Sequence, residues 1–130
     1  MVKTALVTDS SAYLPPALIQ QYGIHVIPLY VHFGSEAFRD GVDLTTAEFY
    51  DRLQRADSLP TTSQPSVGDF LELYRRLSQE AEAIVSIYIS SGLSATVASA
   101  LNARQTLIAE ASERGVDPPA IHVVDSTFTS

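Results

Sequence analysis

Small hydroxyl side chains gather in two short stretches of this sequence. The first stretch is LPTTSQPS, residues 59–66, and the second is SSGLSAT, residues 90–96. Hydroxyls of this kind, together with the unbonded amides at the start of a helix, are suited to binding an anion. Any single Ser or Thr at such a place more often caps its helix or satisfies a loop. The two stretches therefore indicate an anion site only if the fold brings them together.

Charge indicates which kind of anion such a site would hold. The chain has no Lys or Arg between Arg55 and Arg75, and none between Arg76 and Arg104. A phosphate-binding loop of the Walker type adds a lysine to its glycines, and the sequence contains no such motif. Neutral donors suit a singly charged carboxylate better than a polyphosphate.

The energies involved favour a carboxylate that carries a long tail. An exposed helix start stabilises an anion by only about 0.3–1 kcal/mol. Each methylene group of an acyl chain contributes about 0.8 kcal/mol when it is buried. We therefore expect a lipid whose tail supplies most of the affinity and whose head is oriented by the hydroxyls.

The sequence is also compatible with two other functions. Ser94 could be the nucleophile of an enzyme acting on a small acyl substrate, although GLSAT lacks the closing glycine of the G-x-S-x-G turn. The available bases are His25, His32 and His122, and we interpret all three as strand or surface residues. Alternatively, the hydroxyls only cap helices, and the chain is an interaction domain without a ligand.

Composition excludes several further classes of function. The chain has no cysteine, which rules out disulfides and thiolate chemistry. Its aspartates, including Asp9 and Asp125, show no diagnostic metal-ligand spacing, so no metal or other cofactor is expected. A formal net charge of −7 argues against nucleic acid and anionic lipid surfaces as partners. No apolar run reaches membrane-spanning length and no signal peptide is visible, so we expect a cytoplasmic protein without membrane insertion.

The elements that must position the hydroxyls alternate between strand and helix. Apolar runs predict strands at residues 4–9, 24–33, 83–90 and 120–126. Pro28 places the second run at an edge or a bulge, and Gly34 with Ser35 predicts a two-residue hairpin. We predict an α/β fold with three layers, α/β/α, around a mainly parallel sheet of about four strands with a small hairpin excursion. Ligands of such sheets bind beyond the carboxyl ends of the strands, where the hydroxyl-rich turns fall.

Helix signals separate these strands. Thr45 or Thr46 is suited to cap one helix, and Ser66 with Asp69 resembles a capping box before the next. Gly23 and Gly115 are suited to end helices. The aromatic residues Phe49, Phe70 and Tyr74 are interpreted as ordinary packing residues.

Six segments of the chain resemble the DegV family of bacterial fatty-acid-binding proteins. They are VTDSSAYLP (residues 7–15), GIHVIPLYVHFG (23–34), DGVDLTTAEFYDRL (40–53), PTTSQPSVGDF (60–70), ISSGLSATVASA (89–100) and VVDS (123–126). The resemblance runs along the whole chain, so residues 1–130 are similar to the N-terminal α/β domain of a family member. Family members continue into a second domain, which implies that this chain is a truncated, N-terminal half.

The resemblance also implies a function and its residues. It implies a lipid-binding carrier, not an enzyme, that holds a long-chain fatty acid between its two domains. The carboxylate would be bound by Thr62 and Ser94, supported by Ser63, Ser91, Gly92 and Ser10, with no cofactor. The carrier would present the acid to a separate ATP-binding fatty acid kinase subunit. Ala95 stands where the family usually has glycine, a change that could alter the approach of the head group.

Overall fold

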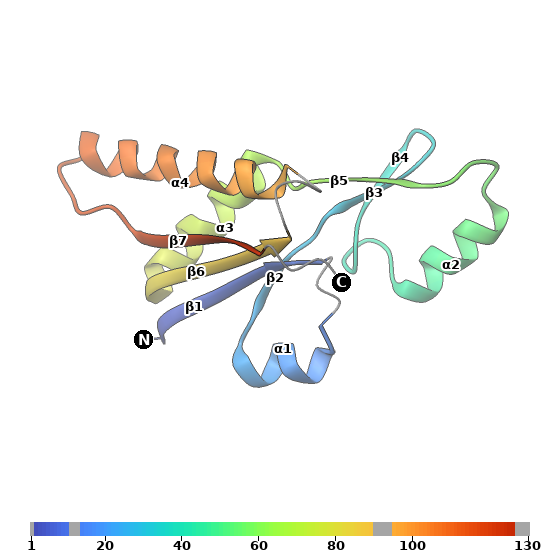
Figure 1. Ribbon diagram of the computed structural model, residues 1–130, viewed down its shortest axis with the longest axis horizontal. Coiled ribbons are helices and arrows are strands. Elements are labelled where there is room, and N and C mark those ends of the chain that lie inside the picture. The colour runs from blue at the N-terminus through green and yellow to red at the C-terminus, as the bar shows by residue number, and fades with distance from the viewer. Residues whose placement is uncertain (1, 11–13, 90–94, 127–130) are drawn as a thin grey trace.

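A parallel sheet forms the centre of the molecule. The structure is a computed structural model that describes residues 2–10, 14–89 and 95–126. Its central strands lie in the order β2-β1-β6-β7, and all three neighbouring pairs are parallel (Figure 1). These strands are β1 (Val2–Asp9), β2 (His25–Ile27), β6 (Ala81–Ile89) and β7 (Ala120–Ser126). The predicted parallel sheet of about four strands is confirmed.

Two long helices cover one face of this sheet. They are α3 (Val67–Glu80) and α4 (Thr96–Glu113), which pack against each other and against β6. Inward-facing side chains of the strands, such as Val7 and Ile84, are at most 2% exposed beneath them. Ala100 and Ala103 are fully buried, and their small size lets α4 approach the sheet closely.

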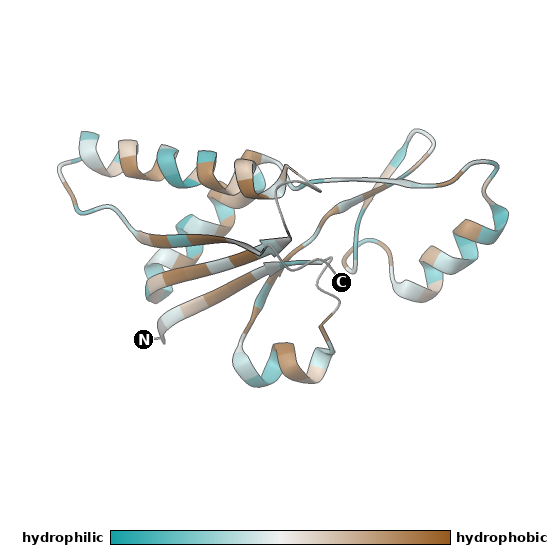
Figure 2. Ribbon diagram, viewed as in Figure 1, coloured by the Kyte–Doolittle hydropathy of each residue, from teal (hydrophilic) through white to brown (hydrophobic). Residues whose placement is uncertain are grey.

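The opposite face of the sheet carries much less cover. Helix α1 (Pro16–Tyr22) lies on this side in Figure 1, and none of its residues is buried. Parallel register places Leu6, Val26, Ile87 and Val124 on this face, where each side chain is 37–46% exposed. Figure 2 shows the hydrophobic character of these central strands. We call these four residues the open face; the two sides together give the predicted three-layer arrangement.

A three-stranded antiparallel sheet forms an excursion beyond the carboxyl ends of the central strands. It contains β3 (Tyr30–Phe33), β4 (Glu36–Arg39) and β5 (Thr61–Ser63) in the order β4-β3-β5. The predicted Gly34-Ser35 hairpin is confirmed, since Phe33 pairs with Glu36 across it. Helix α2 (Thr46–Arg55) begins with a Thr45–Glu48 capping box and packs Phe49 against Phe33 at 5.8 Å between ring centroids.

Two details of the predicted elements were wrong. The single strand expected at residues 24–33 is two strands, because the chain leaves the central sheet at Pro28 and enters the antiparallel sheet at Tyr30. Pro28 lacks the N–H that a continuing strand would need. The stretch at Thr61–Ser63, expected to be a loop, is a short strand paired with β3.

Candidate functional site

The helices that follow the two hydroxyl stretches begin at one end of the central sheet. Figure 1 shows that α3 and α4 both begin at the end where β1, β6 and β7 finish. Strand β1 pairs with β2 on one side and with β6 on the other, so the chain changes direction across the sheet at this point. Such a switch point is where open α/β sheets bind their ligands.

Thr62 is an exposed hydroxyl on an edge strand of the excursion. It lies in the middle of β5 and pairs with Val31 of β3. No hydrogen bond joins its side chain to any residue that the structure describes. Its hydroxyl is therefore available to a ligand.

Ser63 points to the other side of the same strand, since side chains alternate along a β-strand. Its Oγ lies 2.8 Å from Nε2 of His32, and both residues are half-buried. His32 was expected to be a strand residue without a site role; it is a strand residue, and it also holds Ser63 in place. Thr62 and Ser63 thus do not face a ligand together from one side, although Ser63 fixes the strand on which Thr62 lies.

The start of α3 already contains a carboxylate. The predicted capping box is confirmed: Ser66 Oγ accepts from Asp69 N at 3.1 Å, and Asp69 Oδ2 accepts from Ser66 N at 3.0 Å. Tyr30 Oη donates to the same oxygen at 2.9 Å, and this hydrogen bond raises the pKa of the Tyr30 hydroxyl. A second anion at these amides would be repelled by Asp69, so the hypothesis of an anion site at this helix start is not favoured.

The start of α4 differs in this respect. Its N-cap residue is Ala95, which makes no side-chain cap. Thr96 follows as the first helical residue and is 1% exposed. The predicted residues Ser91, Gly92 and Ser94 lie just before this helix but outside the described part of the chain, so their roles stay predictions.

Ser10 has a structural contact of its own. Its Oγ accepts from the main-chain N–H of Leu29 at 3.0 Å. The bond ties the end of β1 to the link between β2 and β3. A supporting role for Ser10 toward a ligand head group therefore stays a prediction, and the structure adds a role in anchoring the excursion.

Beneath this end of the sheet lies a buried polar cluster that the sequence did not reveal. Tyr74 Oη lies 2.9 Å from Ser86 Oγ and 2.8 Å from Tyr88 Oη, and all three residues are at most 1% exposed. Burial raises the pKa of both tyrosine hydroxyls, so they remain protonated. Asp9 is also 1% exposed, and its charge raises the pKa of Tyr88 further. The one available signal was a serine and a tyrosine at inward positions of an apolar strand.

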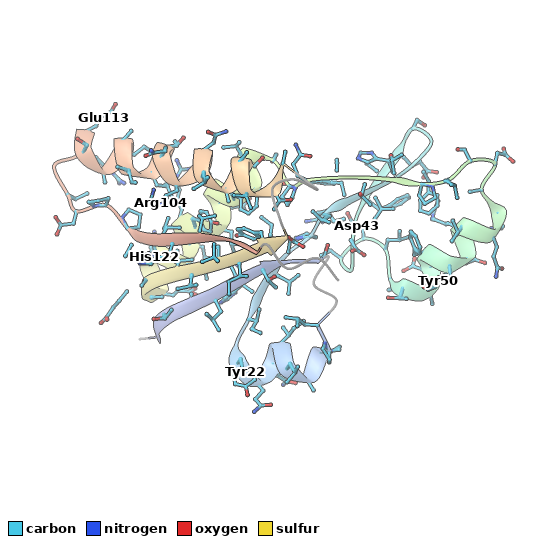
Figure 3. All side chains as sticks on the ribbon, viewed as in Figure 1. Tyr22, Asp43, Tyr50, Arg104, Glu113 and His122 are labelled. Atoms are coloured by element: carbon cyan, nitrogen blue, oxygen red, sulfur yellow. The ribbon has the colours of Figure 1, made fainter. Side chains whose placement is uncertain are left out.

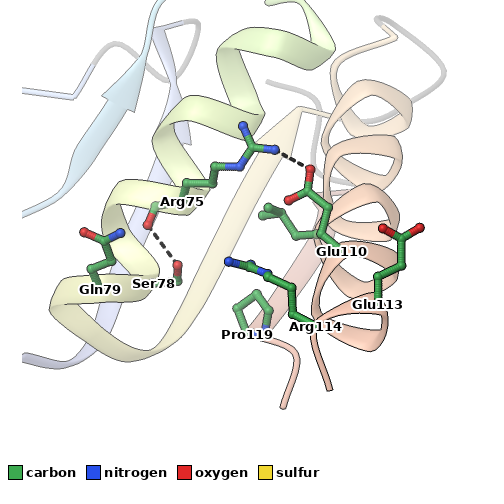
Figure 4. Close-up of a pocket in the computed structure, with 8 residues that line it drawn as sticks. Arg75, Ser78, Gln79, Glu110, Glu113, Arg114 and Pro119 are labelled. Atoms are coloured by element: carbon green, nitrogen blue, oxygen red, sulfur yellow. Dashed lines mark hydrogen bonds and ion pairs between the residues drawn. The ribbon is translucent and has the colours of Figure 1, made fainter. Parts of the chain in front are cut away.

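Other features of the surface do not add to this site. A cavity of about 480 Å³ lies between α3 and α4 and is lined by Arg75, Glu110 and Arg114 among others, with Arg75 paired to Glu110 (Figure 4). It lies at the carboxyl-terminal ends of both helices, away from the candidate site.

Figure 3 shows His122 on β7, in the amino-terminal half of that strand. Within the described ranges, no three His, Asp or Glu side chains are grouped as a metal site would require, and no helix is long and apolar enough to cross a membrane.

Comparison with known proteins gives consistent matches along the chain. The model of the DegV family, described as "Uncharacterised protein, DegV family", matches residues 3–130. A DegV domain-containing protein of Halalkalibacterium halodurans is 49% identical over 104 residues, which make up 79% of this chain and 37% of that protein.

Two solved structures share the fold. One shows fatty acid binding of a DegV family protein from Thermus thermophilus; it is 37% identical, with a TM-score of 0.77 over 95% of this chain and 41% of that one. The other is a stearic-acid-binding protein from Eubacterium ventriosum, 30% identical, with a TM-score of 0.83 over 100% of this chain and 43% of that one. This chain spans about two fifths of the length of these proteins.

Proposed function

This chain belongs to the DegV family, and from that premise we propose that it binds a fatty acid by its carboxylate at the carboxyl ends of the parallel strands. Similar proteins from Thermus thermophilus and Eubacterium ventriosum are described as binding a fatty acid or stearic acid. The residues that bind the head group are Thr62 and Ser94. In the whole protein this chain is the N-terminal domain, and the acyl tail lies between it and a second domain.

The contrast between the two helix starts carries this proposal. The start of α3 is capped by Ser66 and carries the negative charge of Asp69. Among the described residues, none caps the start of α4 with its side chain, and the first turn holds no acidic residue. An added carboxylate is therefore stabilised at α4 and repelled at α3. Thr62 supplies a hydroxyl without a described partner on β5, the strand that lies beyond this end of the sheet (Figure 1).

Neutral donors make the site selective for a head with a single charge. A hydrogen bond to a charged group contributes about 1.5–3 kcal/mol, which orients the acid. The larger share of the affinity comes from burial of the tail. Binding and presenting a fatty acid need no catalytic group on this protein. The bound fatty acid is presented to a cytoplasmic ATP-binding kinase subunit, which forms the acyl phosphate.

Substitution of Thr62 tests the head-group assignment. The experiment uses the full-length protein. Thr62→Val keeps the shape of the side chain and removes its hydroxyl. We expect the affinity for stearic acid, measured by isothermal titration calorimetry, to fall at least about tenfold. Thr61→Val is the matched control, because Thr61 is also exposed but faces the other side of β5. Equal affinities of the Thr62 and Thr61 variants would overturn the assignment.

Covalent labelling separates the carrier from the serine-dependent enzyme. A serine-directed fluorophosphonate should leave the full-length protein unmodified, as judged by its intact mass. An adduct that forms on the unmodified protein but not on the Ser94→Ala variant would show that the protein is a serine-dependent enzyme and not a carrier. Native mass spectrometry of protein purified from bacteria should show a retained fatty acid, which a ligand-free interaction domain would lack.

A further inference from the structure

A cluster of buried hydroxyls joins helix α3 to strand β6. Tyr74 comes from α3, whereas Ser86 and Tyr88 come from inward positions of β6. One hydroxyl, that of Tyr74, contacts both partners at 2.8–2.9 Å. It is the central atom of the cluster.

Stability alone does not account for these hydroxyls. A buried polar group must be hydrogen-bonded to avoid a cost of about 1–3 kcal/mol, and replacing all partners by apolar groups of the same shape is often nearly neutral. Phenylalanine and alanine at these three positions would leave an ordinary apolar core. What the hydroxyls add is direction, because hydrogen bonds weaken steeply when their geometry changes, whereas apolar contacts are non-directional.

Helix α3 and strand β6, which the cluster joins, both have one end at the candidate site. Helix α3 begins five residues after Thr62, and the ring centroids of Phe70, in its first turn, and Tyr88 lie 5.4 Å apart. Strand β6 ends at Ile89, directly after Tyr88. The Tyr74 hydroxyl therefore fixes the position of α3 along β6, and with it the position of β5 relative to the end of the central sheet.

We propose that Tyr74 is a positioning residue for carboxylate recognition, acting through its shared hydroxyl bonds to Ser86 and Tyr88. This role rests on the proposed function. It makes selectivity for the acid head depend on a fully buried side chain. Both tyrosines stay protonated because burial raises the pKa of their hydroxyls, so the three hydroxyls of the cluster carry no net charge.

Tyr74→Phe removes the central hydroxyl and leaves the ring. The test compares stearic acid with octadecanol, which has the same tail and no carboxylate, in the full-length protein. We expect the affinity for stearic acid to fall by about tenfold, equivalent to about 1.4 kcal/mol, while the affinity for octadecanol changes less than about twofold. Ser86→Ala, which removes one partner, should show the same selective loss.

Tyr50→Phe is the matched control, since Tyr50 is 59% exposed on α2 and should change neither affinity. An equal loss for acid and alcohol in Tyr74→Phe would mean that the hydroxyl only stabilises the fold, and would overturn the proposal. Unchanged affinity for the acid in both Tyr74→Phe and Ser86→Ala would also overturn it. Failure of the proposed function gives a different result, because the unmodified protein itself would then show no preference for stearic acid over octadecanol.

Discussion

The two faces of the central sheet are built from the same strands and have different surroundings. On the covered face, Ala5, Val7 and Ile84 are 1–5% exposed beneath α3 and α4. On the other face of the same strands, Leu6 and Ile87 are 37% and 46% exposed. Strands of parallel sheets are typically apolar on both sides because both faces are covered. The sequence of these strands is thus suited to burial on both faces, while the described residues bury only one.

Burial rather than residue type should decide the cost of a substitution in these strands. Ile84→Ala, on the covered face, should lower the free energy of unfolding by about 2–5 kcal/mol, because it leaves a cavity against α3 and α4. Ile87→Ala is the same change three residues along β6 on the open face, and should cost less than about 1 kcal/mol. Chemical denaturation of both variants measures the difference. Equal losses would show that the open face is buried in solution.

Association of the chain should depend on the open face. Exposed apolar patches promote contact between molecules, so the 130-residue chain should self-associate as its concentration rises, as measured by light scattering after size-exclusion chromatography. The double variant Ile87→Glu, Val124→Glu should weaken association at least about tenfold, since each apolar side chain contributes about 1.5–3 kcal/mol when fully buried.

Val116→Glu is the control for that experiment. Val116 is 54% exposed in the connection between α4 and β7, away from the strands. It should leave association unchanged. If the chain stays monomeric at every concentration, the open face does not promote association, and this prediction is wrong.

The smallest expected effect on stability concerns helix α3, which covers one face of the central sheet. Ser66→Ala removes the cap of α3 and should lower the free energy of unfolding by about 1 kcal/mol. Thr45→Ala removes the equivalent cap of α2, which lies in the excursion and buries no residue fully. Hydrogen exchange should show that the first variant loosens α3 over the covered face, whereas the second loosens only α2. The same pattern of exchange in both variants would contradict this separation.

Local signals in the sequence predicted much of the fold. The strands around Val7, Ile84 and Ile121 are apolar runs, and the cap at Ser66 depends on a residue only three positions away. Features that depend on distant partners could not be predicted. Thr62 lies in a strand because it pairs with Val31, and nothing in TTS itself indicates that partner.

The candidate site was predictable in its residue types but not in its contacts. The neutral hydroxyls of the first stretch were visible in the sequence, and the structure adds that Thr62 is exposed. The bonds of Ser63 to His32 and of Tyr74 to Ser86 join residues of different elements, and no periodicity relates them. The meeting of Thr62 with Ser94 remains a prediction from the family resemblance.

The excursion leaves and re-enters the domain at neighbouring points. Tyr30 pairs directly with Ser63, and Ser10 holds the adjoining link through the N–H of Leu29. The segment between them is thus an insertion with its ends already closed, and the entropy of closing such a loop rises only slowly with its length. Changes in the length of this segment between β3 and β5 should therefore cost the central sheet little stability.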